Sequence, residues 1–180
     1  MTTNHKFVFI IPTYNTSHIY KKCLDSVLNQ TYTNWRIVYV DDASTDNTYD
    51  KVSDYIKEHK IENKVKLIKN EKNMKQAYSR YIAFKFCNDD EICCLLDGDD
   101  WLYNNLVLDK LNKFYNDNDV LVTYGNLYTY TKGILKKYDF PDFSEECIKN
   151  KKYRHADWLS CMHLRTGFAR LFKNVPIEQQ

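Results

Sequence analysis

Short apolar runs alternate with amphipathic segments between residues 6 and 124 of the chain. Apolar runs of about four to eight residues, bounded by turn residues, are typical of strands that are buried on both faces of a sheet. Such runs predict strands at residues 6–11, 35–40, 65–68, 92–96 and 120–124. Apolar residues three and four positions apart predict helices at residues 18–29, 47–59, 74–87 and 104–115. This alternation predicts an α/β fold: an open, mostly parallel sheet with helices on both faces.

Polar residues at the starts of these segments are candidate helix caps. Ser17, Asp46 and Asn73 each precede a predicted helix, where a side-chain oxygen can accept hydrogen bonds from free backbone N–H groups. Two further short runs, at residues 128–130 and 134–138, predict a β-hairpin that turns at Lys132–Gly133. No internal repeat or Pro/Gly-rich linker divides the chain, so we expect one domain over residues 1–180.

The composition indicates a folded and nearly neutral protein. Hydrophobic residues make up 43% of the chain and aromatic residues 15%, which argues against disorder. The net charge of +2 predicts no strong attraction to nucleic acid. Positive charge gathers in the last third, where a solvated face is the simpler interpretation and a surface for polyanions or membranes is the alternative. The residues concerned are Lys132, Lys136, Lys137, Lys149, Lys151, Lys152 and Arg154.

The cysteines and the apolar segments bear on the location of the protein. The six cysteines lack zinc-type spacing, and Cys93 and Cys94 are adjacent within a predicted strand. We interpret the cysteines as core residues with reduced thiols. No apolar run approaches the roughly 20 residues of a membrane-spanning helix, and the N-terminus has no signal-peptide pattern. These features predict a cytoplasmic protein without a membrane segment of its own.

Clustered carboxylates follow the predicted strand at residues 92–96. Asp97, Asp99 and Asp100 stand together around Gly98, although aspartate is a poor strand former and neighbouring carboxylates repel each other. A bound divalent cation would offset that repulsion, since Mg²⁺ and Mn²⁺ prefer oxygen ligands. Mg²⁺ usually completes its coordination with substrate phosphates, which suggests a phosphate-bearing ligand. The alternative is a solvated turn in which Asp100 caps the next helix.

Two other polar segments are expected at the same edge of the sheet. Residues 12–15 follow the first predicted strand and residues 41–46 follow the second, and ligands of open α/β sheets bind at the carboxyl ends of the strands. The chain has only four glycines and no glycine-rich phosphate loop, so a bound nucleotide would need another cation for its phosphates. Tyr14 could stack on a base, and Asp42 could accept a hydrogen bond from a base N–H group. The simpler interpretation of each is an ordinary turn residue.

Four ordered motifs resemble those of family 2 glycosyltransferases of the GT-A fold. They lie at residues 10–15, 26–31, 40–48 and 96–100. The resemblance implies a metal-dependent, typically inverting enzyme with Mn²⁺ or Mg²⁺ as cofactor. Such an enzyme transfers sugar from a nucleotide-diphosphate donor, with UDP-sugar favoured here, to a hydroxyl of a carbohydrate or glycoconjugate acceptor. About residues 1–125 would then form the nucleotide-sugar-binding part, and about residues 126–180 the acceptor side.

The resemblance also implies roles for individual residues. The nucleotide-binding set is Pro12, Thr13, Tyr14, Asp42, Arg80 and Asp97. The metal-binding pair is Asp99 and Asp97, with Asp99 favoured for direct contact and Asp97 alternatively contacting the ribose or the waters of the metal. Arg80 could contact the nucleotide or hold a loop carboxylate. The chain departs from the family pattern at Lys75, where glycine is usual, and at Tyr81, where asparagine is usual.

The acceptor side is less defined by sequence. His163 and Arg165 match a segment expected to contact phosphate or acceptor, and Asp157 is the best candidate for the base that deprotonates the acceptor hydroxyl. The base could also be missing, which would make the chain a truncated or N-terminal domain of a larger polypeptide. Two alternatives therefore remain. One is a non-catalytic domain that binds nucleotide sugar; the other is a nucleotidyltransferase, which would need a Gly- and Lys/Arg-rich loop after the first strand.

Overall fold

Four parallel strands form the centre of the sheet in a computed structural model that describes residues 3–118, 122–124, 127–138, 149 and 167–170. They are β1 (Lys6–Thr13), β2 (Trp35–Asp41), β3 (Val65–Lys69) and β4 (Glu91–Leu95). The sheet has the order β3-β2-β1-β4-β8-β5. Its last two strands are β8 (Gly167–Arg170), antiparallel to β4, and β5 (Val122–Tyr124). The chain divides into two compact units, Met1–Thr123 with Phe168–Gln180 and Tyr124–Gly167.

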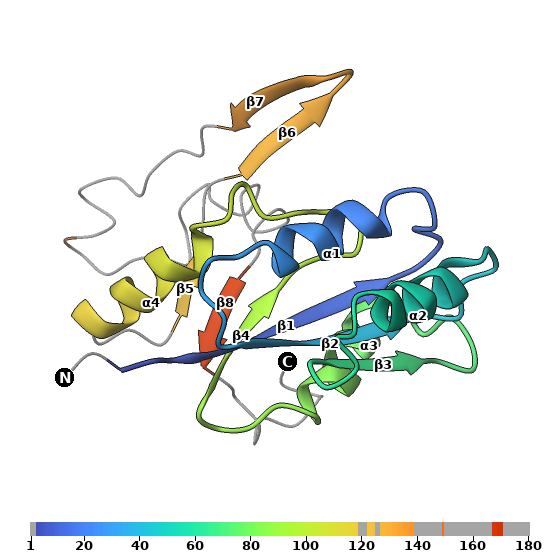
Figure 1. The fold of residues 1–180 in the computed structure, drawn as a ribbon, viewed down its shortest axis with the longest axis horizontal. Helices are drawn as coiled ribbons and strands as arrows, with labels where there is room; N and C mark the ends of the chain where they lie inside the picture. Colours follow the sequence, from blue (N-terminus) through green and yellow to red (C-terminus); the bar gives the residue numbers. More distant parts are fainter. Residues whose placement is uncertain (1–2, 119–121, 125–126, 139–148, 150–166, 171–180) are drawn as a thin grey trace. The chain divides into compact units, whose positions relative to one another are not determined.

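Helices cover both faces of this sheet (Figure 1). The helices are α1 (Tyr20–Leu28), α2 (Thr48–Glu58), α3 (Lys75–Phe84) and α4 (Val107–Asp117). On β1, Phe7 and Phe9 belong to a core cluster with side chains of α1, α2 and α4. Val8 and Ile10, which alternate with them, belong to a second cluster with Ala83 of α3. The predicted α/β fold with a mostly parallel, doubly covered sheet is confirmed.

The continuous apolar run of β1 follows from its central position. Every residue from Phe7 to Ile11 is fully buried, because β2 and β4 pair with its edges and helices cover its faces. Full burial of each such aliphatic or aromatic side chain contributes roughly 1.5–3 kcal/mol, so this strand is the hydrophobic centre of the first unit. Cys23, Cys87, Cys93 and Cys94 are buried free thiols, as expected for core residues. Among the described residues, no helix is long and apolar enough to cross a bilayer.

Two of the three predicted caps accept a hydrogen bond at the start of their helix; one is Asn73, whose Oδ1 accepts from the N–H of Lys75 at 3.2 Å. The structure begins α1 at Tyr20, and Ser17 caps nothing: its N–H donates to Asp46 Oδ2 at 3.2 Å and its carbonyl accepts from Lys51 Nζ. Asp46 does act as a cap, since its Oδ1 accepts from the N–H of Thr48 at 2.9 Å. The predicted cap at Ser17 is wrong because the helix begins later, at Tyr20, whose N–H donates to the carbonyl of Thr16.

Other boundaries shift by a few residues. Helix α3 ends at Phe84 rather than residue 87, and the N–H groups of the next three residues form single turns back onto its last carbonyls. Helix α4 begins at Val107 rather than residue 104. Strand β8 was not predicted.

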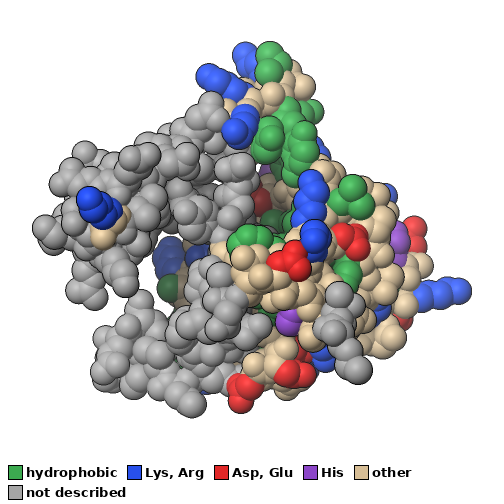
Figure 2. Space-filling model, turned by 90° about the vertical axis from the view of Figure 1, so that its left-hand side faces the viewer, with side chains coloured by type: hydrophobic (Ala, Val, Ile, Leu, Met, Phe, Trp, Pro, Cys, Tyr) green, Lys and Arg blue, Asp and Glu red, His purple; other side chains and the backbone are tan. Residues whose placement is uncertain are grey.

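The described part of the second unit contains a β-hairpin. Strands β6 (Leu127–Thr131) and β7 (Ile134–Tyr138) pair antiparallel and form a sheet of their own. Lys132 and Gly133 both have positive φ, 50° and 83°, as the tight turns of two-residue hairpins require. The hairpin predicted around these two residues is confirmed. Its lysine and hydrophobic side chains are visible at the top of Figure 2.

Candidate functional site

A cavity of about 170 Å³ opens at the carboxyl ends of the central strands. Its walls come from the end of β1 and the following loop, from the loop after β2, from one face of α3 and from the turn after β4. The lining residues are Pro12, Thr13, Tyr14, Thr16, Asp42, Gln76, Ser79, Asp97, Gly98 and Asp99. The three loops that sequence placed at one edge of the sheet therefore meet around one space.

The turn after β4 lies against the end of β1. The N–H of Gly98 donates to the carbonyl of Pro12 at 3.1 Å. A β-carbon built on Gly98 would lie 2.5 Å from Oγ1 and 2.7 Å from Cβ of Thr13, both far inside van der Waals contact. Only glycine fits this position without displacing Thr13. The close approach fixes where the two flanking carboxylates, Asp97 and Asp99, enter the cavity wall.

These two carboxylates have different surroundings. Asp97 Oδ1 accepts from an Arg80 guanidinium nitrogen at 2.7 Å, which ties the turn to α3. Asp99 is exposed and makes no hydrogen bond or ion pair with the described residues. Asp97 thus has one occupied and one available oxygen, whereas both oxygens of Asp99 are available. Arg80 Nε is buried and has no hydrogen-bond partner among the described residues.

The negative charge of the carboxylate turn is only partly compensated by Arg80. Partial loss of hydration, together with the charges of Asp99 and Asp97, raises the pKa of Asp100 to about 6. Burial, and to a lesser extent the charges of Asp100, Asp99 and Asp97, also raises the pKa of the Cys23 thiol, so this group stays protonated. Its Sγ lies 3.7 Å from the carbonyl oxygen of Asp97. A cation beside Asp99 would relieve this repulsion.

The donor set suits a cation that brings most of its ligands with it. In the described ranges, no group of three His, Cys, Asp or Glu side chains forms a ready-made metal cage. Asp99 offers both of its carboxylate oxygens and Asp97 offers one. This matches the way Mg²⁺ binds through one or two carboxylates and substrate phosphates. The residues present therefore fit a divalent cation that is bound jointly with a phosphorylated ligand.

Asp42 has a structural role that sequence did not indicate. Its buried carboxylate accepts from Asn70 Nδ2 and the N–H of Met74 at Oδ1, and from the N–H of Lys75 at Oδ2, at 2.7–2.8 Å. It therefore holds the N-terminus of α3, a favourable place for negative charge. Oδ2 has accepted only one hydrogen bond, so it can accept one more from a ligand in the cavity.

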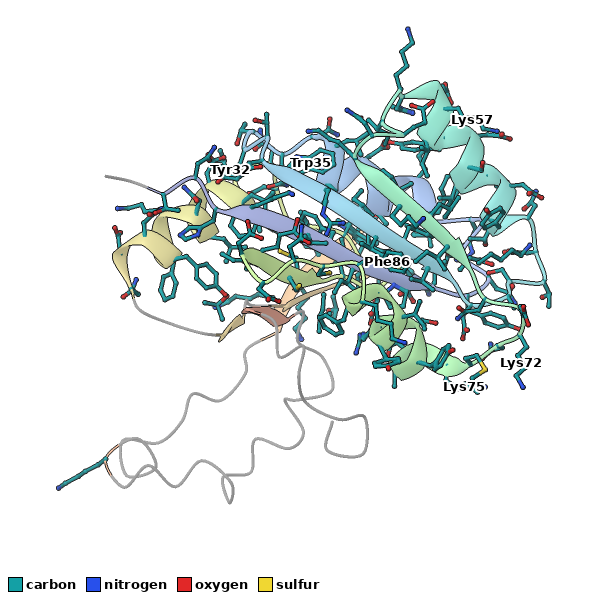
Figure 3. The ribbon with its side chains drawn as sticks, turned by 90° about the horizontal axis from the view of Figure 1, so that it is seen from below. Tyr32, Trp35, Lys57, Lys72, Lys75 and Phe86 are labelled. Atoms are coloured by element: carbon teal, nitrogen blue, oxygen red, sulfur yellow. The ribbon has the colours of Figure 1, made fainter. Side chains whose placement is uncertain are left out.

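Lys75 starts α3 in an unusual backbone conformation. Its φ is +73°, a region that non-glycine residues avoid at a cost of roughly 1–2 kcal/mol. This is the position where the family pattern usually has glycine. Its side chain is exposed at the beginning of α3 (Figure 3). The hydrogen bond from its N–H to Asp42 Oδ2 helps to hold this strained residue in place.

Sequence reasoning missed two residues of α3 that line the cavity, Gln76 and Ser79. They are three positions apart, which places them on one face of the helix. Ser79 is buried, and its Oγ accepts from Asn70 Nδ2 at 3.0 Å. The sequence did offer one signal: Gln76 and Ser79 lie just before Arg80, which was predicted to belong to the site.

The remaining predicted residues divide into two groups. Tyr14 lines the cavity with 45% of its surface exposed, so its ring is accessible to a ligand. Asp157, His163 and Arg165 lie outside the described residues.

Comparisons with known proteins agree with this geometry. The family model for glycosyl transferase family 2 matches residues 8–179. Over 117 residues the chain is 33% identical to UDP-Glc:alpha-D-GlcNAc-diphosphoundecaprenol beta-1,3-glucosyltransferase WfgD of Escherichia coli, covering 65% of this chain and 44% of that protein.

Two solved structures share the fold. One is S. aureus TarS 1–349 in complex with UDP-GlcNAc, with 28% identity, a TM-score of 0.58 and coverage of 65% of this chain and 33% of that one. The other is the mannosyltransferase PcManGT from Pyrobaculum calidifontis in complex with GDP-Man and Mn²⁺, with 25% identity, a TM-score of 0.62 and coverage of 67% and 35%. The chain spans less than half the length of these three proteins. With the GT-A fold of these neighbours and a family match over almost its whole length, the chain belongs to glycosyl transferase family 2.

Proposed function

We propose that this chain binds a nucleotide-diphosphate sugar, with UDP-sugar favoured, and transfers its sugar to a hydroxyl group of a carbohydrate or glycoconjugate acceptor. The observation that carries the proposal is the shared cavity of Asp42, Asp97 and Asp99. In this cavity Asp42 Oδ2 can accept one more hydrogen bond, and the carboxylate of Asp99, at the turn after β4, is available to a cation.

The base is proposed to bind between Tyr14 and Asp42. Tyr14 offers an exposed ring for stacking, and the unused lone pair of Asp42 Oδ2 can accept one N–H group. The N3–H of uracil supplies one donor of this kind. The UDP-GlcNAc bound to TarS and the UDP-Glc in the name of WfgD support uridine, whereas PcManGT binds GDP-Man.

The diphosphate is proposed to bind through a divalent cation, Mn²⁺ or Mg²⁺, held by Asp99 with Asp97 Oδ2. When bound, such a cation neutralises charge that develops on the leaving diphosphate. Arg80 acts as a positioning residue, because its bond to Asp97 Oδ1 orients the other carboxylate oxygen. Thr13 and Gly98 set the spacing between the base and this turn.

Transfer with inversion requires a base that takes the proton of the acceptor hydroxyl as this oxygen attacks the anomeric carbon. We assign that role to Asp157, and contacts with diphosphate or acceptor to His163 and Arg165. These assignments rest on the sequence pattern alone. The named relative WfgD acts on a lipid-linked sugar, which makes a glycoconjugate acceptor a reasonable first choice.

Calorimetric titration with UDP tests the proposal, first with Mn²⁺ and then with EDTA. We expect binding that needs the cation and is lost in Asp99→Asn. Asp54→Asn, a matched loss of one exposed carboxylate on α2, should bind as the wild type does. Equal binding in EDTA would refute the metal-bridged site, and binding of GDP or TDP instead of UDP would refute the uridine preference. A donor that binds but is neither transferred nor hydrolysed would favour a non-catalytic binding domain.

A further inference from the structure

The β6–β7 hairpin forms a small sheet of its own, and most of its side chains are exposed. It pairs with no other strand among the described residues, and every side chain from Thr129 to Lys137 is exposed. A two-stranded hairpin alone is at best marginally stable in water. The exposed side chains of the hairpin are therefore accessible to a binding surface.

Apolar side chains gather at the tip of the hairpin. Ile134 is 70% exposed, Tyr130 51% and Leu135 46%. Tyr130 pairs with Leu135 across the strands, and Thr131 pairs with Ile134. Because successive strand residues point to opposite faces, Leu135 and Ile134 lie on different sides of the hairpin. The tip is therefore apolar on both faces.

Positive charge surrounds these apolar residues. Residues 127–138 contain Lys132, Lys136 and Lys137 and no acidic residue, a formal charge of +3. The entire chain carries only +2. Figure 2 shows lysine and hydrophobic side chains together on the hairpin. By register, Lys136 lies on the face of Ile134 and Lys137 on the face of Leu135.

We propose that the tip of the β6–β7 hairpin docks onto the surface of an anionic lipid bilayer. Ile134, Leu135 and Tyr130 enter the interfacial region, and the three lysines reach the lipid phosphates. A protein partner would normally cover one face of a hairpin, whereas a bilayer interface can surround a tip that is apolar and basic on both faces. Long lysine side chains suit this position, since their stems can lie along apolar surface while their ammonium groups stay at the phosphates.

Vesicle co-sedimentation tests the docking surface without nucleotide or sugar transfer, so its outcome is independent of the proposed function. Wild-type protein should sediment with vesicles of phosphatidylcholine mixed with phosphatidylglycerol, and at least about tenfold less with phosphatidylcholine alone. The variant Ile134→Ser/Leu135→Ser and the variant Lys132→Ser/Lys136→Ser/Lys137→Ser should each lose about tenfold or more of the binding to anionic vesicles.

Matched controls separate the hairpin from general surface properties. Phe114→Ser removes an apolar side chain on α4 that is 45% exposed. Lys57→Ser/Lys60→Ser/Lys110→Ser removes the same charge from other exposed positions. Both should bind vesicles as the wild type does, and all variants should keep its thermal unfolding midpoint and UDP titration. Equal losses in the control and hairpin variants, or no vesicle binding by the wild type, would overturn the proposal in favour of a protein partner or a solvated hairpin.

Discussion

Gly98 packs against Thr13 so closely that no side chain fits between them: an added β-carbon would lie 2.5 Å from Thr13 Oγ1. We expect Gly98→Ala to lower the free energy of unfolding by about 1–3 kcal/mol, because the turn or β1 must shift to make room. UDP affinity with Mn²⁺ should fall as well, since the shift moves Asp99. Urea unfolding and calorimetry measure the two effects.

A double variant checks the cause of this effect. Thr13→Gly removes both atoms that the new β-carbon would meet most closely. The loss of stability caused by Gly98→Ala should therefore be smaller in the Thr13→Gly background than in the wild type. Equal losses in both backgrounds would show that the contact with Thr13 is not the cause.

The strained backbone of Lys75 predicts a stabilising substitution. Lys75→Gly should raise the free energy of unfolding by about 0.5–1 kcal/mol, since glycine accepts a φ of +73° without steric cost but loses more conformational freedom on folding. Ala77→Gly, two residues later within α3, should instead lower it by about 1 kcal/mol. Denaturant unfolding of both variants gives the comparison, and a loss of stability in Lys75→Gly would contradict the prediction.

The two functional aspartates should differ in their effect on stability without ligand. Asp42→Asn should lower the free energy of unfolding by about 1–3 kcal/mol, because an amide cannot accept all three of the present hydrogen bonds. Asp99→Asn should leave stability equal or slightly higher, since it removes repulsion with its neighbours. Both should weaken UDP binding with Mn²⁺. Similar stability losses in the two variants would refute this division of roles.

Glu91 predicts a loss of stability in acid. Burial alone would raise its pKa, but hydrogen bonds from Arg36, the N–H of Asn88 and Lys6 outweigh burial and lower the pKa from 4.5 to about 2. The carboxylate thus contributes about 3 kcal/mol that is fully present above about pH 5 and is lost as the pH falls from 4.5 through 2. Unfolding measured across this range should show the decline.

Substitution of Glu91 identifies the group responsible. Glu91→Gln should lower stability near neutral pH by about 3 kcal/mol, because Arg36 loses its partner, and should flatten the pH dependence between pH 5 and 2. Glu58→Gln, at an exposed position on α2, should change neither. An unchanged acid profile in Glu91→Gln would mean that other carboxylates cause the decline.

The sequence predicted the sheet well because the physical signal was local. A strand such as β1, buried on both faces, must be a continuous apolar run, and the loops that follow β1, β2 and β4 must meet at one edge. The turn at Lys132–Gly133 was also predictable from these two residues alone. In each case the residues that form the element carry the information themselves.

The missed features depend on partners far away in the chain. Ser17 matched a cap, but Asp46 and Lys51 engage its backbone. Asp42 anchors α3 through N–H groups more than thirty positions later. Strand β8 pairs with β4 from the other end of the chain, and its own sequence carries little strand pattern. Such contacts arise only when the fold brings distant segments together.

Asp42 lines the cavity and also accepts from the N–H of Met74, just before α3, and from that of Lys75, its first residue, so this helix start can report on binding. A donor that bonds to Asp42 Oδ2 changes the charge density seen by the amide protons of Met74 and Lys75. Their nuclear magnetic resonance shifts should therefore move on nucleotide binding, and their exchange with solvent should slow. The resonances of these two amides would then report which base occupies the site, without any label on the ligand.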